Sequence, residues 1–391
     1  MADHPTTHVD PAEAVAAWIG TQRAEMLALL EELVNIDGGS RDKAGVDAVG
    51  AALRRFLEGA GVACEAVPVA EFGDALRAAV PGRAGNRPVM LLGHRDTVFP
   101  KGEPLRRPFR IEGDRAYGPG VADMKAGLVI NAFTLAGYAK FGPAGSPVVG
   151  LFTSDEEIGS PASRPIIEAE ARGARAVFNS EPGRPSGAVV TRRKGGVFSR
   201  CEITGKAAHS GANFADGASA IEELARKVQA LHALTDLEAG TTVNVGLVSG
   251  GQSINTVAPW AVLEIDLRYV DPADRDRLAG AIRAVAETCT TPGTTSRWEI
   301  LGEFLPLAPT PESEALFGLY AEAAAASGLR VTAEATGGCA DSGFTAGVGT
   351  PTVCGTGPVG GAAHTPEDWL DLTSLAPRAQ ALARAVGRAA G

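Results

Sequence analysis

The chain has 391 residues, of which 45% are hydrophobic and 21% are charged. These values are ordinary for a globular protein and exclude a collagen-like or wholly disordered chain. At roughly 150 residues per domain, the length fits two domains, or one large domain with an insertion. With 36 basic and 46 acidic residues the formal net charge is −10. We therefore expect no nucleic-acid partner and no membrane partner, because both need a basic binding surface.

The N-terminal residues MADHPTTHVDP lack the basic and apolar regions of a secretory signal, and no run approaches the roughly 18 to 20 apolar residues of a spanning helix. The cysteines are odd in number and show no C-x-x-C spacing, which argues against a disulfide framework. We expect free thiols in a cytoplasmic protein. The five are Cys64, Cys201, Cys289, Cys339 and Cys354.

Apolar residues recur at steps of three and four over residues 11–36, which predicts a first helix there. Short continuous apolar runs follow, and such runs are typical of strands that are covered on both faces. Helical patterns lie between them, notably over residues 124–141. Together they predict an α/β fold with a predominantly parallel sheet and helices on both faces. The predicted strands cover residues 87–93, 146–154, 174–180 and 350–357.

Residues 195–303 have a different pattern, with long strands in which apolar and polar residues alternate. Alternation is typical of an antiparallel sheet with one exposed face. Two amphipathic helices, near 215–234 and 272–289, complete a β-α-β-β-α-β order, which predicts a ferredoxin-like insertion. The main domain is then discontinuous and comprises residues 1–194 and 304–391.

Side chains that can bind a metal follow several of the predicted strands, and one more lies in the Gly-rich turn GPGVADMKAG. In open α/β sheets, functional groups collect beyond the carboxyl ends of the strands. A DEE triplet alone is usually solvated surface, and a single buried histidine is usually a core residue. Their joint placement at four strand ends favours one site. The residues are His94 and Asp96, Asp123, Asp155 to Glu157, Glu181, and His364.

Imidazole and carboxylate together suit zinc and similar divalent transition metals. Five plausible ligands exceed the three protein groups of one catalytic zinc, so two metals sharing a carboxylate fit better. We expect Asp96 to orient the His94 ring rather than to share the metal, because a carboxylate on the second ring nitrogen is the usual partner of a metal-binding histidine. Of the neighbours Glu156 and Glu157, one would bind metal and the other would activate water.

At these residues the sequence resembles the co-catalytic di-zinc peptidase and amidohydrolase family. This family includes bacterial glutamate carboxypeptidase, aminoacylase, acetylornithine deacetylase and succinyl-diaminopimelate desuccinylase. The motif pattern of this chain is most similar to that of glutamate carboxypeptidase. The motifs occur in family order over nearly the whole chain. They are GHRDTV (93–98), GPGVADMKAG (118–127), TSDEEIGS (153–160), NSEP (179–182), GKAAHSG (205–211), GGQSINTVAP (250–259), DLR (266–268) and GPVGGAAHTPEDW (357–369).

The resemblance implies a di-zinc catalytic domain with an inserted lid that often dimerises. It implies two Zn²⁺ per subunit, with Co²⁺ or Mn²⁺ as alternatives. The implied roles are His94 and Glu181 on one metal, Glu157 and His364 on the other, Asp123 bridging both, Glu156 as general base, and Asp96 as the support of His94.

In the lid, the resemblance implies that His209 stabilises the oxyanion, often in a partner's site, and that Asn255 and Arg268 hold the substrate's free carboxylate. Arg268 lies on the polar face of an alternating strand, where a cross-strand ion pair with a neighbouring acid is the other interpretation. Lys194, with the two arginines before it, would hold an acidic side chain or belong only to hinge surface. Glu303 would repel a second carboxylate if it faced the site.

The function that follows is hydrolysis of the amide bond to a C-terminal amino acid, such as glutamate, in a small N-acyl amino acid or short peptide. The nearest alternative is an N-acyl amino acid deacylase, in which the released amino acid is the useful product. A non-catalytic binding protein with the same fold is a remote third. We expect a homodimer formed through the lid.

Overall fold

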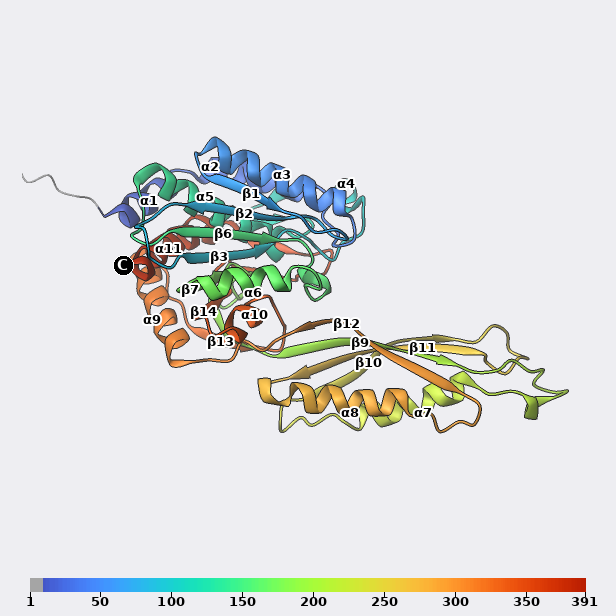
Figure 1. Ribbon diagram of the computed structural model, residues 1–391. Coiled ribbons are helices and arrows are strands. Elements are labelled where there is room, and N and C mark those ends of the chain that lie inside the picture. Colours follow the sequence, from blue (N-terminus) through green and yellow to red (C-terminus); the bar gives the residue numbers. More distant parts are fainter. Residues whose placement is uncertain (1–9) are drawn as a thin grey trace, which may run out of the picture. The chain divides into compact units, whose positions relative to one another are not determined.

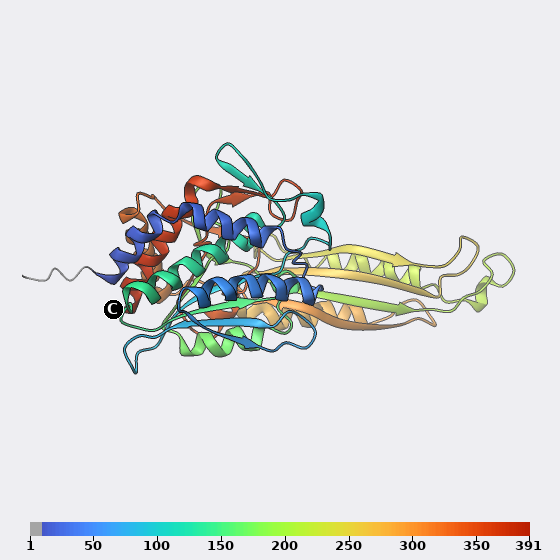
Figure 2. The ribbon, with the colours of Figure 1, turned by 90° about the horizontal axis from the view of Figure 1, so that it is seen from above.

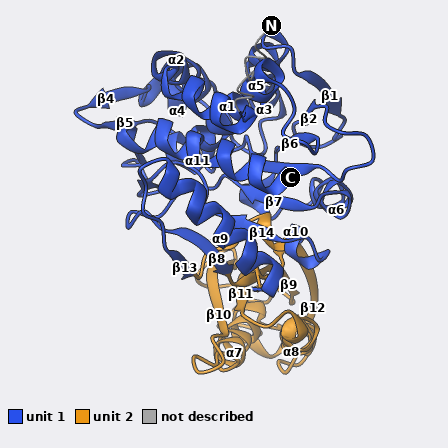
Figure 3. Cartoon of the chain, turned by 90° about the vertical axis from the view of Figure 1, so that its left-hand side faces the viewer, with its two compact units in different colours: residues 1–192, 309–335, 344–391 blue, residues 193–308, 336–343 orange. Residues whose placement is uncertain are grey.

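The computed structural model describes residues 10–391, so His4 and His8, which have no predicted role, lie outside the described residues. The chain forms two compact units (Figure 3). Unit 2 comprises residues 193–308 and 336–343, and unit 1 comprises the rest. Unit 2 thus begins two residues before the predicted insertion at 195, ends five residues after 303, and takes in the separate segment 336–343. The predicted domain boundaries stay a prediction.

In chain order, the helices are α1 (Pro11–Gly20), α2 (Arg23–Val34), α3 (Lys43–Gly59), α4 (Glu103–Arg106), α5 (Ala126–Phe141), α6 (Arg164–Gly173), α7 (Ala220–His232), α8 (Arg275–Glu287), α9 (Pro311–Ala326), α10 (Ser342–Gly347) and α11 (Leu372–Ala390), with short turns η1 (Val121–Lys125), η2 (Glu156–Ile158), η3 (Phe214–Asp216) and η4 (Pro272–Asp274). Among residues 10–391, no helix has the length and apolar character needed to cross a bilayer.

The strands are β1 (Ala63–Val67), β2 (Ala75–Val80), β3 (Val89–His94), β4 (Arg110–Glu112), β5 (Arg115–Tyr117), β6 (Val148–Thr153), β7 (Ala176–Asn179), β8 (Val189–Arg193), β9 (Gly195–Thr204), β10 (Thr242–Gly250), β11 (Trp260–Tyr269), β12 (Thr295–Phe304), β13 (Ala333–Thr336), β14 (Thr352–Cys354), β15 (Gly360–Gly361) and β16 (Trp369–Asp371).

The main sheet of unit 1 has eight strands in the order β1-β2-β6-β3-β7-β14-β8-β13. Its parallel centre, β6-β3-β7-β14, consists of the four strands that the apolar runs predict. The flanking strands β2 and β8 pair antiparallel with this centre, so the whole sheet is mixed rather than predominantly parallel. The sequence does not reveal β1 because its residues are exposed or only half-buried and form no apolar run.

Helices cover both faces of this sheet, as predicted. The chain passes from β3 through α5 to β6 and then returns through α6 to β7 on the other side of β3. Because both crossovers between parallel strands are right-handed by rule, opposite directions of travel put α5 and α6 on opposite faces. Helix α5 also contacts α1 and α11, and Figure 2 shows it among the helices that lie over one face. Packed between sheet and helices, α5 is apolar all round.

The predicted helix over residues 11–36 is two helices, α1 and α2. They separate at Thr21, whose hydroxyl donates a hydrogen bond of 2.7 Å to the carbonyl of Trp18. This local bond offers the backbone an alternative to a continuing helix. The apolar spacing continues across the break, which is why periodicity alone predicts one helix.

Unit 2 has the predicted β-α-β-β-α-β order, β9-α7-β10-β11-α8-β12. Its antiparallel sheet has the order β10-β11-β9-β12, and Figure 1 shows α7 and α8 together on one face. The alternation is complete in β11, where Ala261, Leu263, Ile265, Leu267 and Tyr269 are buried and the residues between them are not. Unit 2 therefore has its own apolar core and the ferredoxin-like fold that its sequence predicts.

Candidate metal centre and active site

The ends of β3 and β7 are held together by α5. Asn131 of α5 donates to the carbonyl of Leu92 at 3.2 Å and accepts from the Ser180 hydroxyl at 2.7 Å. Gly127 lies in the first turn of α5, where a Cβ atom would stand only 2.0 Å from the carbonyl oxygen of Ser180. Because glycine permits this close approach, the turn that carries Asp123 lies beside the strand end that carries Glu181.

Asp96 is fully buried and connects two strand ends. Its carboxylate accepts hydrogen bonds of 3.1 Å from the backbone N–H groups of Glu156 and Glu157, and one of 2.6 Å from Ser40. The backbone carbonyl of Asp96 lies 3.0 Å from Nδ1 of His94. A carbonyl can only accept, so Nδ1 carries the proton of the neutral ring and Nε2 keeps its lone pair.

His364 reaches the cluster from a small sheet that the sequence does not predict, in the order β15-β16-β5-β4. It lies in the connection between β15 and β16, and its backbone has φ of 63°. A left-handed conformation is uncommon for a residue with a Cβ atom, and such residues gather at functional sites. Its side chain is 54% exposed, the most accessible of the cluster.

Two groups of atoms meet on Asp123. His94 Nε2 lies 3.3 Å from Asp123 Oδ1 and 3.4 Å from Glu181 Oε1. His364 Nε2 lies 3.3 Å from Asp123 Oδ2 and 3.0 Å from Glu157 Oε2. These groups have the composition that the family resemblance implies for two metals sharing one carboxylate. The assignment of ligands stays a prediction.

Glu156 is close to the same cluster, since its Oε2 lies 3.8 Å from His94 Nε2. Ligand atoms of His94, Glu156 and Glu181 all lie within 4.8 Å of one another, as do those of His94, Asp123 and Glu157. Glu157 thus lies near both imidazoles, with its short contact of 3.0 Å to His364, whereas Glu156 contacts His94. The structure brings together the predicted ligands of unit 1 with Glu156 and Asp96, whereas the carboxylate of Asp155 accepts from the backbone N–H groups of Ala162 and Ser163.

The residues present fit divalent metal ions. His94 Nε2, Asp123 Oδ1 and Glu157 Oε1 are buried and have no hydrogen-bond partner among the described residues. Buried polar atoms are normally satisfied, and carboxylates this close repel one another without a cation. Imidazole nitrogen and carboxylate oxygen are a donor set that suits zinc and related transition metals.

Without metal, the charges and hydrogen bonds of the cluster shift the pKa values of the proposed ligands. Hydrogen bonds to Asp123 and Glu157 raise the pKa of His364 to about 10. Burial, together with the negative charge of Asp123, raises the pKa of Glu157 to about 7. Without metal, protons therefore occupy this cluster at neutral pH, and a metal must displace them.

Two buried residues near the cluster are missed by the sequence prediction. Ser40 donates to Asp96, as described above, although it lies 56 residues away along the chain. Asp368 is fully buried, and burial and the charge of Asp123 raise its pKa well above the usual range. The motif HTPEDW draws attention only to His364, so the sequence gives no signal that separates Asp368 from surface acids.

In unit 2, His209 and Asn255 lie side by side. The backbone N–H of Ser210 donates to the carbonyl of Asn255, and His209 pairs with Thr256 in a β-bridge. Nδ1 of the exposed His209 accepts from the backbone N–H groups of Gly211 and Ala212 at 3.1 Å. The neutral ring therefore carries its proton on Nε2, which can donate to an oxyanion.

Arg268 lies at the opposite end of the same sheet. It pairs with Gly196 at the start of β9, whereas His209 and Asn255 lie beyond the other end, where Trp260 pairs with Thr204. The eight residue steps from Trp260 to Arg268 span about 26 Å in a strand. His209 and Asn255 therefore cannot contact the same small substrate as Arg268 of their own chain.

The side chain of Arg268 is partly buried and is held by its neighbours. Nε donates to Asp266 at 2.8 Å, and Nη1 lies 2.7 Å from the thiol sulfur of Cys339. The acid that pairs with Arg268 is therefore Asp266, two residues earlier on β11, and not a residue of a neighbouring strand. The guanidinium also stacks at 5.1 Å on the ring of Phe198.

The basic segment before β9 is engaged in contacts within unit 2. Lys194 Nζ donates to the carbonyl of Gly240 at 2.6 Å, and Arg193 donates to the carbonyls of Gly338 and Cys339. Glu303 forms an ion pair with Arg275. These side chains therefore have partners within unit 2, and the substrate-binding role of Lys194 stays a prediction.

Comparison with known proteins supports the resemblance found in the sequence. The sequence profile described as Peptidase family M20/M25/M40 matches residues 90–388. Carboxypeptidase G2 of Pseudomonas sp. (strain RS-16) is 29% identical over 375 residues, covering 93% of this chain and 89% of its own. An acetylornithine deacetylase of Vibrio campbellii is 26% identical, covering 77% of this chain and 81% of its own.

The fold is also found in solved structures. The M20 family metallo-carboxypeptidase Sso-CP2 from Sulfolobus solfataricus matches with a TM-score of 0.78 and 18% identity, covering 94% of this chain and 99% of its own. A tripeptidase from Staphylococcus aureus matches with a TM-score of 0.74 and 21% identity, covering 94% and 98%. At these identities the likeness is one of fold.

Proposed function

Since this chain belongs to peptidase family M20/M25/M40, whose enzymes are metal-dependent hydrolases, we propose that it cleaves the amide bond between an acyl or aminoacyl group and a C-terminal amino acid such as glutamate. The observation that carries the proposal is the cluster in which two imidazoles and three carboxylates meet around Asp123. The 29% identity with carboxypeptidase G2 over nearly the full length supports the carboxypeptidase reading.

The ligand roles belong to the same proposal: His94 and Glu181 hold one zinc ion, His364 and Glu157 hold the other, and Asp123 holds both. Bound there, two divalent ions would polarise the substrate carbonyl and lower the pKa of an attacking water to about 7. Asp96 keeps Nδ1 of His94 protonated and its Nε2 directed at the site.

Glu156 is the proposed general base. Its carboxylate lies at the edge of the cluster, 3.8 Å from His94 Nε2, and its backbone is fixed by Asp96. It takes a proton from the attacking water and gives a proton to the departing nitrogen. One O–H bond of the water is thus replaced by one N–H bond of the released amine. Such a group typically contributes about 10²–10⁴ in rate.

We propose that the active form is a homodimer in which His209 and Asn255 of one subunit serve the site of the other. The separation of these residues from Arg268 along β11 supports this arrangement. Among residues 10–391, strand β10 has a neighbour on one side only and carries exposed Leu247 and Val248. Edge strands of this kind can pair with another chain. Arg268 would then hold the substrate carboxylate with its guanidinium.

The test is a substrate panel assayed with metal-loaded protein. One arm contains benzoyl-, folyl- and peptidyl-glutamate, and the other contains acetyl and succinyl derivatives of several amino acids. Release of glutamate from the first arm is expected. Activity confined to the second arm would favour the N-acyl amino acid deacylase, which the identity with acetylornithine deacetylases supports. Tight metal binding without release from any substrate would contradict the proposal and favour a binding protein. A cytoplasmic location stays part of this proposal.

A further inference from the structure

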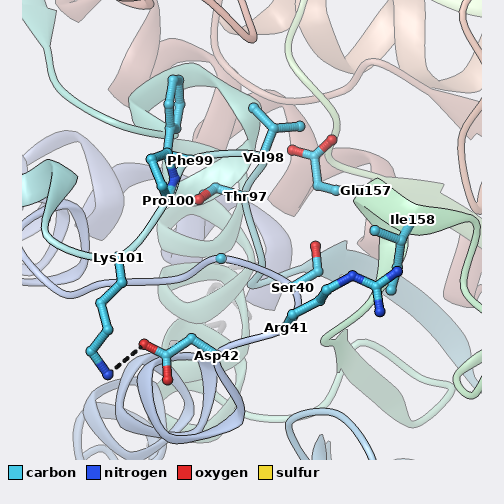
Figure 4. Close-up of a pocket in the computed structure, with 11 residues that line it drawn as sticks. Ser40, Arg41, Asp42, Thr97, Val98, Phe99, Pro100, Lys101, Glu157 and Ile158 are labelled. Carbon is cyan, nitrogen blue, oxygen red and sulfur yellow. Dashed lines mark ion pairs between the residues drawn. The ribbon is translucent and has the colours of Figure 1, made fainter. Parts of the chain in front are cut away.

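A cavity of about 450 Å³ lies in unit 1 beside the candidate metal centre (Figure 4). Three segments form its walls: residues 39–42 before α3, residues 97–101 after β3, and residues 157–158 of η2. Its volume is within the range of small-molecule sites, about 300–1,000 Å³. In the proposed function, named residues bind the reacting amide and the released amino acid. No residue is yet assigned to the acyl group.

The walls of the cavity are fixed to each other by the backbone. The N–H of Thr97 donates to the carbonyl of Gly38 at 2.7 Å, and Gly39 forms a parallel bridge with Thr97. A Cβ atom on Gly39 would stand 2.7 Å from the carbonyl oxygen of Phe99. The glycine thus permits the two loops to approach closely, and the cavity is preformed.

One wall of the cavity belongs to the metal cluster itself. Glu157 lines the cavity, and its Oε2 lies 3.0 Å from Nε2 of His364. A group bound in the cavity would therefore lie next to an amide that reacts at the cluster. Val98, Phe99 and Ile158 add apolar surface, so the cavity suits an acyl chain.

The two cations of the cavity differ in their surroundings. Lys101 forms an ion pair with Asp42 at 3.0 Å, which neutralises its charge. Arg41 is exposed and makes no ion pair or side-chain hydrogen bond with any residue from 10 to 391. Figure 4 shows its side chain extending from the loop toward Ile158. An arginine fork that has no protein partner can bind a carboxylate with two parallel hydrogen bonds.

We propose that this cavity is the acyl subsite and that Arg41 makes it selective for acyl groups ending in a carboxylate, such as succinyl or an acidic aminoacyl group. This inference rests on the proposed function, because it names the part of the substrate on the acyl side of the cleaved amide. Apolar atoms of the acyl chain contact Val98, Phe99 and Ile158, and its terminal carboxylate pairs with Arg41.

The experiment compares two substrates that differ only in charge. They are the N-succinyl derivative and its neutral isostere, the N-succinamoyl derivative, of the amino acid that the substrate panel selects. The ratio of their kcat/KM values is measured with metal-loaded wild type and with Arg41→Gln. Wild type is expected to favour the succinyl substrate, and Arg41→Gln is expected to lower the ratio about tenfold, which corresponds to about 1.4 kcal/mol. The loss is expected in KM.

Arg23→Gln is the matched control. Arg23 is also an exposed arginine without an ion pair among the described residues, and it begins α2 without lining the cavity. Arg23→Gln removes the same charge from the chain as Arg41→Gln, so an effect of net charge alone would appear in both variants. Arg41→Lys should recover part of the ratio, since it restores the charge without the fork.

The outcomes separate the two proposals. If both substrates are cleaved but their ratio is the same in wild type and Arg41→Gln, the acyl subsite is wrong and the proposed function stands. An equal fall in the ratio for Arg23→Gln would also overturn the subsite. If metal-loaded wild type cleaves substrates of the panel but neither of these two, the acyl subsite is also wrong and the proposed function stands. If it cleaves no substrate of the panel, the proposed function falls and this inference falls with it.

Discussion

The carboxylate of Asp96 accepts a hydrogen bond of 3.1 Å from the backbone N–H of Glu156, so a side chain two residues after β3 fixes the residue proposed to move the proton. The same carboxylate holds the next backbone N–H, and the Asp96 carbonyl meets the ring of His94. One buried side chain therefore sets the positions of both the proposed base and a proposed ligand.

Replacing Asp96 with alanine should weaken metal binding and turnover together. It removes the acceptor that fixes the Glu156 backbone and the negative charge beside His94. We expect metal affinity and kcat each to fall by about 10- to 100-fold, as for partners of metal-binding histidines elsewhere. Metal titration and steady-state kinetics check this.

Ser40→Ala is the comparison for that variant. It removes a single donor to Asp96 and leaves both backbone donors in place. Its effect should therefore be clearly smaller. An equal loss in both variants, or none in Asp96→Ala, would contradict the anchoring role.

Metal binding should release protons, and its affinity should rise with pH. In the metal-free protein the pKa of His364 is raised to about 10 and that of Glu157 to about 7, so both groups hold protons below these values. A metal needs the neutral imidazole and the carboxylate, and each displaced proton makes the affinity rise up to about tenfold per pH unit below the pKa.

Calorimetric titration of metal into the metal-free protein, in two buffers of different ionisation enthalpy, counts these protons. We expect at least one proton per protein at pH 7, and more at pH 6. Zn²⁺, Co²⁺ and Mn²⁺ should all bind. Binding without proton release would mean that His364 is not a ligand.

Two inactive variants should restore each other if His209 acts on a partner's site. Mixing His209→Ala with Glu156→Gln gives mixed dimers in which one site has both an intact Glu156 and an intact His209 from the other subunit. Random exchange makes half of the dimers mixed, so activity should return to about a quarter of wild type. If His209 serves its own site, the mixture stays inactive. Sedimentation that shows only monomers would also exclude the arrangement.

Arg268→Ala should raise KM more than it lowers kcat, because the guanidinium is proposed to hold the part of the substrate that does not react. We expect an increase of KM of about 10- to 100-fold, the worth of a charge-assisted hydrogen bond. Arg268→Lys should recover only part of the loss. Steady-state kinetics on the preferred substrate measures both. An unchanged KM would show that the contacts with Asp266 and Cys339 are its whole role.

Much of the fold follows from local patterns. Continuous apolar runs predict the four parallel strands, and alternation predicts the sheet of unit 2, because each pattern records which faces are buried. The edge strands and the small sheet around His364 are too short and too exposed to leave a pattern. The break at Thr21 is accompanied by a hydrogen bond of its hydroxyl to Trp18, which does not change the apolar spacing.

For the site, the sequence predicts the residues that the strand ends bring together, from His94 to His364. Ser40 and Asp368 are missed because long-range packing alone places them beside the cluster. The separation of Arg268 from Asn255 could have been predicted from the sequence. Asn255 precedes the ten-residue strand β11 and Arg268 lies near its end, so the length of the strand keeps them apart.

The most direct test of the account is the metal content and the turnover of Glu156→Gln, measured on the same preparation. This change keeps the size of the side chain and removes its ability to take a proton. The account predicts a wild-type amount of bound metal and a fall in kcat of about 10²–10⁴, whereas Glu157→Gln should lose metal. Near-wild-type turnover by Glu156→Gln, on a substrate that the wild type cleaves, would contradict it.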